Sequence, residues 1–450
     1  MRSWRIIIGG ADWNLLWHHH FPGDGDEHGS VLLCGVIDEG DDRRLLVREV
    51  VPAREGIDYV PGNRGYRRLT AEFVAATIDR CARNGLAYVA VHNHWGRESV
   101  SFSDVDTASH ERGYPALLDI TRCGPVGALV LAEDAAAGDI WTSRDRSELE
   151  ALVVTGPARK RLTPRPQPSL PSDPACDRQV RLFGDRGQQI LRTLRIGLLG
   201  LGGAGSLINQ ALAHLRVGTI VGVDDDIIDL TSLPRVVGAT VEDAEAGTPK
   251  VSVAERLVEA IGSGTRFEGI RANAVDDVAG RALSRCDVLF LAADSMQARH
   301  VANAICQQYL IPGFQVGAKV PATDGVVGDP FAVTRVLGPD GLCMWCAELI
   351  SPTRLQEEGL SAEQRRFAQY VPGVIAPSVI TMNALSTALA MNDFLFMVTG
   401  LLQASDLTPR WYYFRTRTFG EETARAGDPN CPECAGRKAK GDRARLPVKV

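Results

Sequence analysis

The feature that most constrains the fold is a glycine-rich turn between an apolar run and a helical segment. The turn Gly200-x-Gly202-x-x-Gly205 follows the predicted strand 195–199 and precedes the predicted helix 207–215. Glycines let the backbone approach a phosphate, and the following helix start offers free N–H groups. Asp224, nineteen residues after Gly205, ends the next predicted strand, where a carboxylate can accept hydrogen bonds from ribose. The turn predicts a nucleotide site without choosing between NAD and ATP.

The surrounding pattern predicts an α/β fold with a Rossmann-like, mostly parallel sheet over residues 176–450. Short apolar strands at 219–223 and 287–292 alternate with a predicted helix at 250–261, as in strand–helix–strand units. Residues 1–150 predict a separate α+β domain, with strands at 31–37, 45–51 and 86–91 and helices at 69–84 and from 106. Between them, 151–175 is predicted to be a proline-rich linker, because 157–174 holds six prolines.

The composition is that of an ordinary soluble protein rather than a nucleic-acid or membrane protein. The chain has 450 residues, 45% apolar and 23% charged, and a net charge of -6, which gives no sign of nucleic-acid binding. It has no apolar run of the length needed for a membrane span, and its start is unlike a signal peptide. We therefore expect a cytoplasmic protein, in which paired cysteines indicate a metal site rather than disulfides.

Two Cys-x-x-Cys pairs predict one structural zinc site. Cys343 and Cys346 form the first pair, and Cys431 and Cys434 form the second. Four thiolates make a closed tetrahedral set with no open position for catalysis. We expect the site to tie the C-terminal tail back onto the second domain and to stabilise its fold.

Charged residues recur at set distances around the glycine-rich turn. Five segments carry these residues. The first, 177–184, contains Arg178 and precedes the turn. After the turn come Asp224-Asp225-Asp226, Leu233-Pro234-Arg235, Gly247-Thr248-Pro249-Lys250, and Leu291-Ala292-Ala293-Asp294 with Arg299. In this order the segments resemble the ThiF/MoeB/HesA superfamily of ubiquitin-activating-type adenylyltransferases, over about 176–436. Thr231, Ser232 and Val236 stand where that family usually has Ser, Asn and Gln.

The resemblance implies a set of roles for these residues. It implies that ATP is bound and that Mg²⁺ is held by Asp294, a hard oxygen ligand. Arg235 and Lys250 would contact phosphate and stabilise the charge that develops when a carboxylate attacks the α-phosphate. It also implies a homodimer in which Arg178 reaches the partner's site. The nucleotide-binding set is then Gly200, Gly202, Gly203, Gly205, Asp224, Asp226, Arg235 and Lys250.

A second constellation lies in the first domain. His92-Asn93-His94 follows a predicted strand, Phe102-Ser103-Asp104-Val105-Asp106 comes soon after, and Glu27 precedes the strand 31–37. Alternate strand residues share one face, so both histidines can bind one ion. Together the segments resemble the JAMM (JAB/MPN) metalloproteases over about 1–145.

That resemblance implies a catalytic zinc with two histidines, an aspartate and an open position for water. The ligands would be His92, His94 and Asp106, with Glu27 as the general base and Ser103 stabilising the oxyanion. Asp106 is one residue further from His94 than is usual in the family and Asp104 one residue nearer, so Asp104 stays open as the third ligand.

The chain lacks a cysteine where many activating enzymes carry a reactive one. No cysteine lies between Cys346 and Cys431, and of the other thiols only Cys176 is expected to be exposed. We therefore expect the acyl adenylate to pass directly to an external nucleophile. Cys34, Cys81, Cys123, Cys286 and Cys306 are the remaining thiols, with Cys286 and Cys306 expected to pack in the core.

Together the motifs predict a multifunctional enzyme. It would adenylate the C-terminal carboxylate of a ubiquitin-like or sulfur-carrier protein ending in glycine, with a conjugating enzyme or other external acceptor downstream, while the first domain trims or removes that protein. Sulfur-carrier activation for thiamine or molybdopterin synthesis is one alternative, and a non-catalytic scaffold that binds a ubiquitin-like protein is another. An NAD oxidoreductase is disfavoured by Arg235, Lys250 and Asp294. Whether the two sites act in sequence or in opposition stays open.

Overall fold

The chain forms two compact units. The structure, a computed structural model, describes residues 3–62, 67–121, 124–143, 145–156, 159–320, 322–323, 326–339, 342–360, 377–402, 409–421 and 427–449. Unit 1 comprises Met1–Pro168 with the short segments Gln308–Leu310 and Arg437–Ala444. Unit 2 comprises Ser169–Gln307, Ile311–Gly436 and Arg445–Val450. None of the helices in these ranges has the length and apolar character needed to cross a bilayer.

Unit 1 is built on an eight-stranded sheet that closes on itself. Its strand order is β1-β3-β2-β4-β5-β6-β7-β8, and β1 also pairs in parallel with β7, which makes the sheet barrel-like. The strands are β1 (Trp4–Gly9), β2 (Gly29–Glu39), β3 (Asp42–Pro52), β4 (Ala87–Asn93), β5 (Val126–Leu131), β6 (Ala136–Trp141), β7 (Arg146–Thr155) and β8 (Lys160–Leu162).

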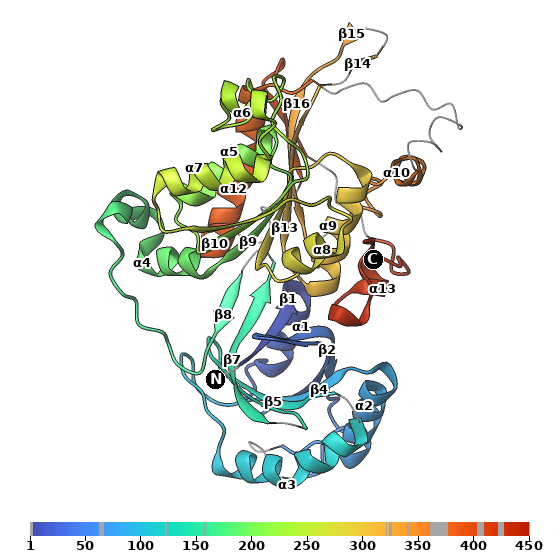
Figure 1. Ribbon diagram of the computed structural model, residues 1–450. Helices are drawn as coiled ribbons and strands as arrows, with labels where there is room; N and C mark the ends of the chain where they lie inside the picture. The colour runs from blue at the N-terminus through green and yellow to red at the C-terminus, as the bar shows by residue number, and fades with distance from the viewer. Residues whose placement is uncertain are drawn as a thin grey trace. The chain divides into compact units, whose positions relative to one another are not determined.

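Two apolar clusters hold this sheet. One lies with α1 (Gly10–His20) and includes the buried residues Trp4, Trp13 and Leu16. The other lies under α2 (Ala71–Asn84) and α3 (Asp104–Thr121), which run along one side of β4 and β5 in Figure 1. Burial of both sheet faces explains why the strands carry long apolar runs rather than a clean alternation.

The first half of the expected linker is part of this sheet. β7 extends to Thr155, and β8 pairs with it through Leu162. Leu152, Val154 and Leu162 are buried in the cluster around α1. The proline content misled the prediction, because five of the six prolines in 157–174 come after Leu162 and only Pro157 precedes it. The change from unit 1 to unit 2 falls at Pro168 and Ser169.

Unit 2 is the predicted α/β fold with a parallel-rich sheet. Its strand order is β11-β10-β9-β12-β13-β16-β17-β18, with parallel pairing from β11 to β13 and antiparallel pairing beyond. The strands are β9 (Arg195–Leu199), β10 (Thr219–Val223), β11 (Arg266–Ile270), β12 (Val288–Leu291), β13 (Gly313–Lys319), β16 (Phe331–Leu337), β17 (Arg410–Tyr413) and β18 (Thr418–Glu421). A separate ribbon joins β14 (Ala322–Thr323) to β15 (Val326–Val327).

Helices cover both faces of this sheet (Figure 1). The core lies under α5 and α12, where Phe394 packs against Phe290 and Phe314 with ring centroids 5.5 and 6.3 Å away. The helices of unit 2 are α4 (Asp177–Thr193), α5 (Gly203–His214), α6 (Val241–Ala246), α7 (Lys250–Ile261), α8 (Asp277–Leu283), α9 (Met296–Tyr309), α10 (Pro352–Gly359), α12 (Ile380–Thr399) and α13 (Cys434–Arg437). The last two residues of α9 and the last residue of α13 belong to segments grouped with unit 1.

The strand order places a crevice at one edge of the sheet. β9 pairs with β10 on one side and with β12 on the other, so the chain reverses its direction of strand addition at β9. In open α/β sheets such a switch point, at the carboxyl ends of the strands, is where ligands bind. The glycine-rich turn follows β9 and therefore lies at this point.

Candidate functional site

The glycine-rich turn is packed so closely that two of its glycines leave no room for a side chain. Gly200 has φ +96°, and a Cβ there would lie 2.8 Å from the Ala293 nitrogen. A Cβ on Gly205 would lie 1.9 Å from the Gly200 carbonyl oxygen. Gly202 is different, because a Cβ there would meet nothing within 4 Å. Gly200 and Gly205 thus allow close packing of the backbone, while Gly202 leaves the space beside the turn open.

Asp224, as predicted, stands at the end of β10 beside this turn. Its carboxylate accepts hydrogen bonds from the backbone N–H of Leu201, at 2.6 Å, and of Asp226, at 2.9 Å. Burial raises the pKa of Asp224, and the nearby Lys250 ammonium opposes that shift. Lys250 begins α7, and its Nζ lies 2.6 Å from Asp226 Oδ2 and 3.9 Å from Asp224 Oδ1.

One cavity of about 1020 Å³ in unit 2 brings most of the predicted nucleotide residues together. Arg235 and Asp294, far apart in the sequence, both line it. Neither side chain makes a hydrogen bond or ion pair with the described part of the chain, so both are available to a ligand. The predicted residues that line the cavity are Gly200, Gly202, Gly203, Asp224, Asp226, Arg235, Lys250 and Asp294.

Two predicted residues lie elsewhere. Gly205 packs behind the turn against Gly200. Arg178 is exposed near the start of α4 and does not line the cavity. Ser232 is buried and bonds to Asp229, its Oγ donating to Oδ1 at 2.8 Å. Its hydroxyl therefore stabilises the local turn and is not among the cavity-lining groups.

The cavity also has a wall that the motifs did not predict. Arg335 of β16, Arg354 of α10 and Asn383 of α12 line it together with Arg299. Asn383 lies against the turn, since a Cβ on Gly203 would be 2.3 Å from its Nδ2. Arg299 belongs to the motif segment that carries Asp294, whereas Arg335, Arg354 and Asn383 come from distant segments without a local motif, so only tertiary folding reveals those three.

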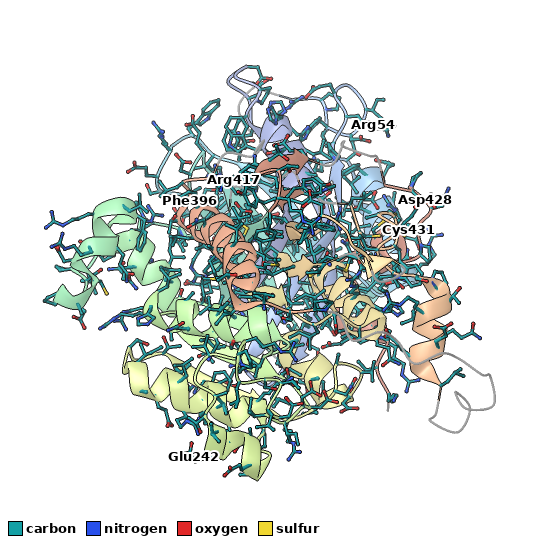
Figure 2. All side chains as sticks on the ribbon, turned by 90° about the horizontal axis from the view of Figure 1, so that it is seen from above. Arg54, Glu242, Phe396, Arg417, Asp428 and Cys431 are labelled. Carbon is teal, nitrogen blue, oxygen red and sulfur yellow. The ribbon has the colours of Figure 1, made fainter. Side chains whose placement is uncertain are left out.

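The four predicted cysteines meet in unit 2. The Sγ atoms of Cys343 and Cys431 lie 3.8 Å apart, as do those of Cys346 and Cys434, and all four atoms lie within 4.8 Å of one another. A tetrahedral zinc with bonds of about 2.3 Å requires sulfur–sulfur edges of about 3.8 Å. The set therefore fits the closed zinc site that was predicted. Figure 2 shows Cys431 beside Asp428, whose carbonyl accepts the Cys431 N–H.

The remaining thiols of the described residues are buried. Cys34, Cys81 and Cys306 are fully inaccessible, and burial raises the pKa of each. Cys286 is 2% exposed. The expectation that Cys176 is exposed is wrong, because its exposed fraction is 0%. Cys123 lies outside the described residues.

The histidine motif of unit 1 forms a second candidate metal centre. His92 Nε2 lies 3.1 Å from His94 Nε2, and Asp106 Oδ2 lies 3.5 and 3.4 Å from these atoms. A tetrahedral zinc with bonds of about 2.0–2.1 Å has edges of about 3.3–3.4 Å, so the three groups fit one ion. The structure brings Asp106, rather than the exposed Asp104, to the histidines.

Two further predicted residues lie beside these three. Glu27 Oε1 is 3.9 Å from His94 Nε2, and burial raises the pKa of Glu27. Burial also acts to raise the pKa of Asp106, but hydrogen bonds from His92, His94 and Ser103 lower it overall. Ser103 Oγ donates to Asp106 Oδ2 at 2.7 Å, so this hydroxyl orients the aspartate. Its oxyanion role stays a prediction.

The Glu27 segment is fixed by a buried histidine at the end of α1. His20 closes α1 and is fully buried. Its Nε2 lies 2.8 Å from Ser30 Oγ and its Nδ1 3.3 Å from Asn93 Oδ1, which also accepts the His28 N–H at 2.7 Å. Asn93 therefore links the strand of the histidine motif to the segment that carries Glu27.

The fold and cavity of unit 2 define a nucleotide-binding α/β protein with a glycine-rich turn at its switch point. The model of the ThiF family matches residues 176–434, which is more than half of the chain. The protein therefore belongs to the ThiF family. The match begins after Pro168, where the first segment of unit 1 ends, so the JAMM resemblance remains a prediction.

Curated relatives are similar to part of this chain. The SAMP-activating enzyme E1 of Haloferax volcanii is 29% identical over 163 residues, covering 36% of this chain and 56% of the relative. The sulfur carrier protein ThiS adenylyltransferase of Escherichia coli is 31% identical over 120 residues, covering 27% and 47%. The chain thus spans about half the length of the curated relatives it matches.

A solved structure of E. coli MccB with MccA-N7isoASN covers 58% of this chain and 75% of its own. Its TM-score is 0.46 and its sequence identity is 18%.

Proposed function

We propose that unit 2 adenylates the C-terminal carboxylate of a ubiquitin-like or sulfur-carrier protein. The observation that carries this proposal is the single cavity in which Arg235, Lys250 and Asp294 join the glycine-rich turn. Membership of the ThiF family supports it. The relatives are named as enzymes that activate SAMP or adenylate sulfur-carrier proteins, and this chain is inferred to act on a substrate of that kind.

The reaction requires charge to be neutralised at the α-phosphate. A carboxylate oxygen of the carrier attacks the α-phosphorus of ATP, the bond to the bridging oxygen breaks, and pyrophosphate leaves with that electron pair. Arg235 and Lys250 stabilise the added negative charge. Asp294 has a carboxylate without a partner in the described chain and would hold Mg²⁺, an oxygen-seeking ion that shields phosphate charge.

The acyl adenylate is proposed to pass directly to an external nucleophile. The described thiols outside the four-cysteine site are buried, so they are closed to a carrier tail. A nonreducing gel after incubation with ATP and carrier tests this step. We expect no thiol-labile adduct on the enzyme, and a band shift abolished by reductant would contradict direct transfer.

The adenylation proposal is tested by ATP–pyrophosphate exchange with small proteins ending in glycine that are encoded beside this chain. We expect carrier-dependent exchange, its loss in Asp294→Ala, and its retention in Glu255→Ala on the exposed side of α7. Absence of exchange with every such carrier would favour the non-catalytic scaffold. Biosynthetic neighbours would point to thiamine or molybdopterin synthesis, and a conjugating enzyme would point to protein modification.

A second function is favoured by one observation in unit 1. His92, His94 and Asp106 present three ligand atoms 3.1–3.5 Å apart, with Glu27 beside them. We infer a zinc-dependent peptidase or isopeptidase that removes residues from the carrier's C-terminus. Zinc bound there would acidify a water at its open position. Glu27 would take the water's proton, and Ser103 would keep Asp106 oriented.

Zinc content and cleavage test this second function separately. We expect two zinc ions per purified chain, one in His94→Ala, and two in Glu27→Gln, which would lose cleavage of a carrier extended beyond its terminal glycine. His18→Ala on the exposed side of α1 serves as the matched control. One zinc ion per wild-type chain, held by the cysteines, would contradict the proposal.

We also propose that two copies of the chain pair, with Arg178 of each reaching the partner's cavity. The support is that Arg178 is exposed and absent from its own cavity. Mixing Arg178→Ala with Asp294→Ala chains tests this: each mixed dimer then contains one cavity that has both groups intact, and exchange activity should reappear.

A further inference from the structure

The cavity of unit 2 has a second group of cations, separated from Lys250 along the sheet. Strand order places Asp224 and Lys250 after β10, the glycine-rich turn after β9 and Asp294 after β12. Arg335 lies beyond them on β16, and Arg299 and Arg354 come from α9 and α10. The cavity therefore has cations on both sides of the glycine-rich turn.

Arg335 and Arg354 both lie close enough to Arg299 to affect its pKa. The pKa of Arg299 is lowered by burial and further by Arg354 and Arg335, while Asp294 and Glu358 act in the opposite direction. The buried Nε of Arg299 has no hydrogen-bond partner in the described part of the chain. Arg299 Nη1 donates to the Leu349 carbonyl at 3.0 Å. Guanidinium groups that share one cavity wall favour an anionic ligand such as a carboxylate or a phosphate.

Helix α10 brings Arg354 to this wall through a specific contact. The carboxylate of Glu358 accepts the N–H of Met296 at 3.0 Å and of Gln297 at 2.9 Å, in the first turn of α9. A carboxylate is favoured there because the helix N-terminus carries partial positive charge. Glu358 thereby holds α10 against the first turn of α9, which begins just after Asp294. Its carboxylate is bonded to the N-terminus of α9 and not to Arg354.

We propose that Arg299, Arg335 and Arg354 form a subsite for the terminal carboxylate of the carrier protein, with Glu358 as the residue that positions Arg354. This inference rests on the adenylation proposed above. The assignment to the carboxylate follows from the geometry of the reaction. Ribose and phosphate contacts are supplied at Asp224 and at the glycine-rich turn, so the acid enters from the β16 side, opposite to them. Pyrophosphate is the other anion of this reaction, and the test separates the two.

The test uses the full chain with a nonhydrolysable ATP analogue that has a methylene group between the α- and β-phosphorus. The probe is a fluorescent decapeptide ending in Gly-Gly, with a free carboxylate or an amide, and binding is followed by anisotropy. We expect the acid to bind at least about tenfold more tightly than the amide, as a charge-assisted pair requires. Arg354→Ala should remove that difference and leave the affinity for the ATP analogue within about twofold.

Glu358→Gln should weaken binding of the acid peptide in the same direction, because a neutral amide holds the α9 N-terminus less firmly. Glu357→Gln on the same helix is the matched control and should bind both peptides like the wild type. Arg354→Lys keeps the charge and should retain part of the discrimination between acid and amide. Melting temperatures of all variants confirm that each is folded.

Equal affinity of the wild type for acid and amide would overturn the subsite. If Arg354→Ala loses affinity for the ATP analogue but still binds the acid peptide, the arginines would be assigned to pyrophosphate. That result would overturn their assignment to the terminal carboxylate of the carrier. A failed ATP–pyrophosphate exchange would contradict the adenylation proposal alone. Peptide discrimination is read without turnover, so the two failures can be told apart.

Discussion

Lys250 Nζ lies 2.6 Å from Asp226 Oδ2, so the cation that should meet phosphate is paired with a carboxylate that lines the same cavity. Asp226 is 67% exposed at its side chain, whereas Lys250 is 10% exposed. An exposed carboxylate contributes little to an ion pair because water screens it. Lys250 can therefore exchange Asp226 for a phosphate oxygen at small cost.

Replacement of Lys250 by methionine should impair adenylation far more than folding. The variant keeps the apolar stem of the side chain and loses the charge that stabilises the α-phosphate during attack. We expect kcat/KM in ATP–pyrophosphate exchange to fall roughly a hundredfold, the size of losses on removing one such donor. Arg281→Ala on the exposed face of α8 is the control. An unchanged kcat/KM in Lys250→Met would exclude this lysine from the reaction.

Gly202 and Gly205 should respond differently to alanine. A Cβ on Gly205 would lie 1.9 Å from the Gly200 carbonyl, and one on Gly202 would meet nothing within 4 Å. Gly205→Ala should lower the free energy of unfolding by about 1–3 kcal/mol, as overpacking does. Gly202→Ala should leave it within about 0.5 kcal/mol but raise KM for ATP. Urea unfolding and exchange kinetics measure both, and equal destabilisation would argue against the open space beside Gly202.

The adenylation half of the site was predictable because its signals are local. The strand before Gly200, the helix after it and the intervals to Arg235, Lys250 and Asp294 are all properties of short segments. Arg335, Arg354 and Asn383 were not predicted, because nothing in their neighbours marks them as cavity residues. Their role follows from strand order and from the contact of Glu358 with α9.

Unit 1 shows the same limit more clearly. The histidine motif was found because His92, His94 and Asp106 are close in sequence. The closure of the barrel was missed because it depends on parallel pairing of Ile7 with Val153, residues distant in the chain. The burial of His20 likewise depends on tertiary packing, because Trp13, Leu16 and His20 form the buried side of α1.

Loss of one cysteine of the four-cysteine site should reduce both zinc content and stability. Cys431→Ser removes one thiolate, and a structural zinc site contributes directly to folding. We expect one zinc ion fewer per chain and a lower melting temperature of unit 2. Cys306→Ser, a fully buried thiol outside the site, is the control and should keep its zinc. Elemental analysis and calorimetry measure the two effects, and unchanged zinc content in Cys431→Ser would contradict the site.

Acid should destabilise unit 1 through His20. Full burial lowers the pKa of His20 from 6.5 to about 3, and the neighbouring His19 adds to that shift. In the unfolded chain the imidazole takes up a proton below pH 6.5, whereas in the folded unit it stays neutral. Its contribution to stability is therefore complete above pH 6.5 and is lost as the pH falls towards 3.

The expected loss is about 1.4 kcal/mol per pH unit below the unfolded pKa. His20→Gln cannot titrate, so its unfolding free energy should fall less steeply with pH by that amount, even though the variant starts from a lower value at pH 7. His18→Gln, on the exposed side of the same helix, should follow the wild type. Urea unfolding between pH 4.5 and 7, with hydrogen exchange of β2 and β4 as the readout for unit 1, measures the three slopes. Parallel slopes for the wild type and His20→Gln would show that His20 is not the group that makes unit 1 sensitive to acid.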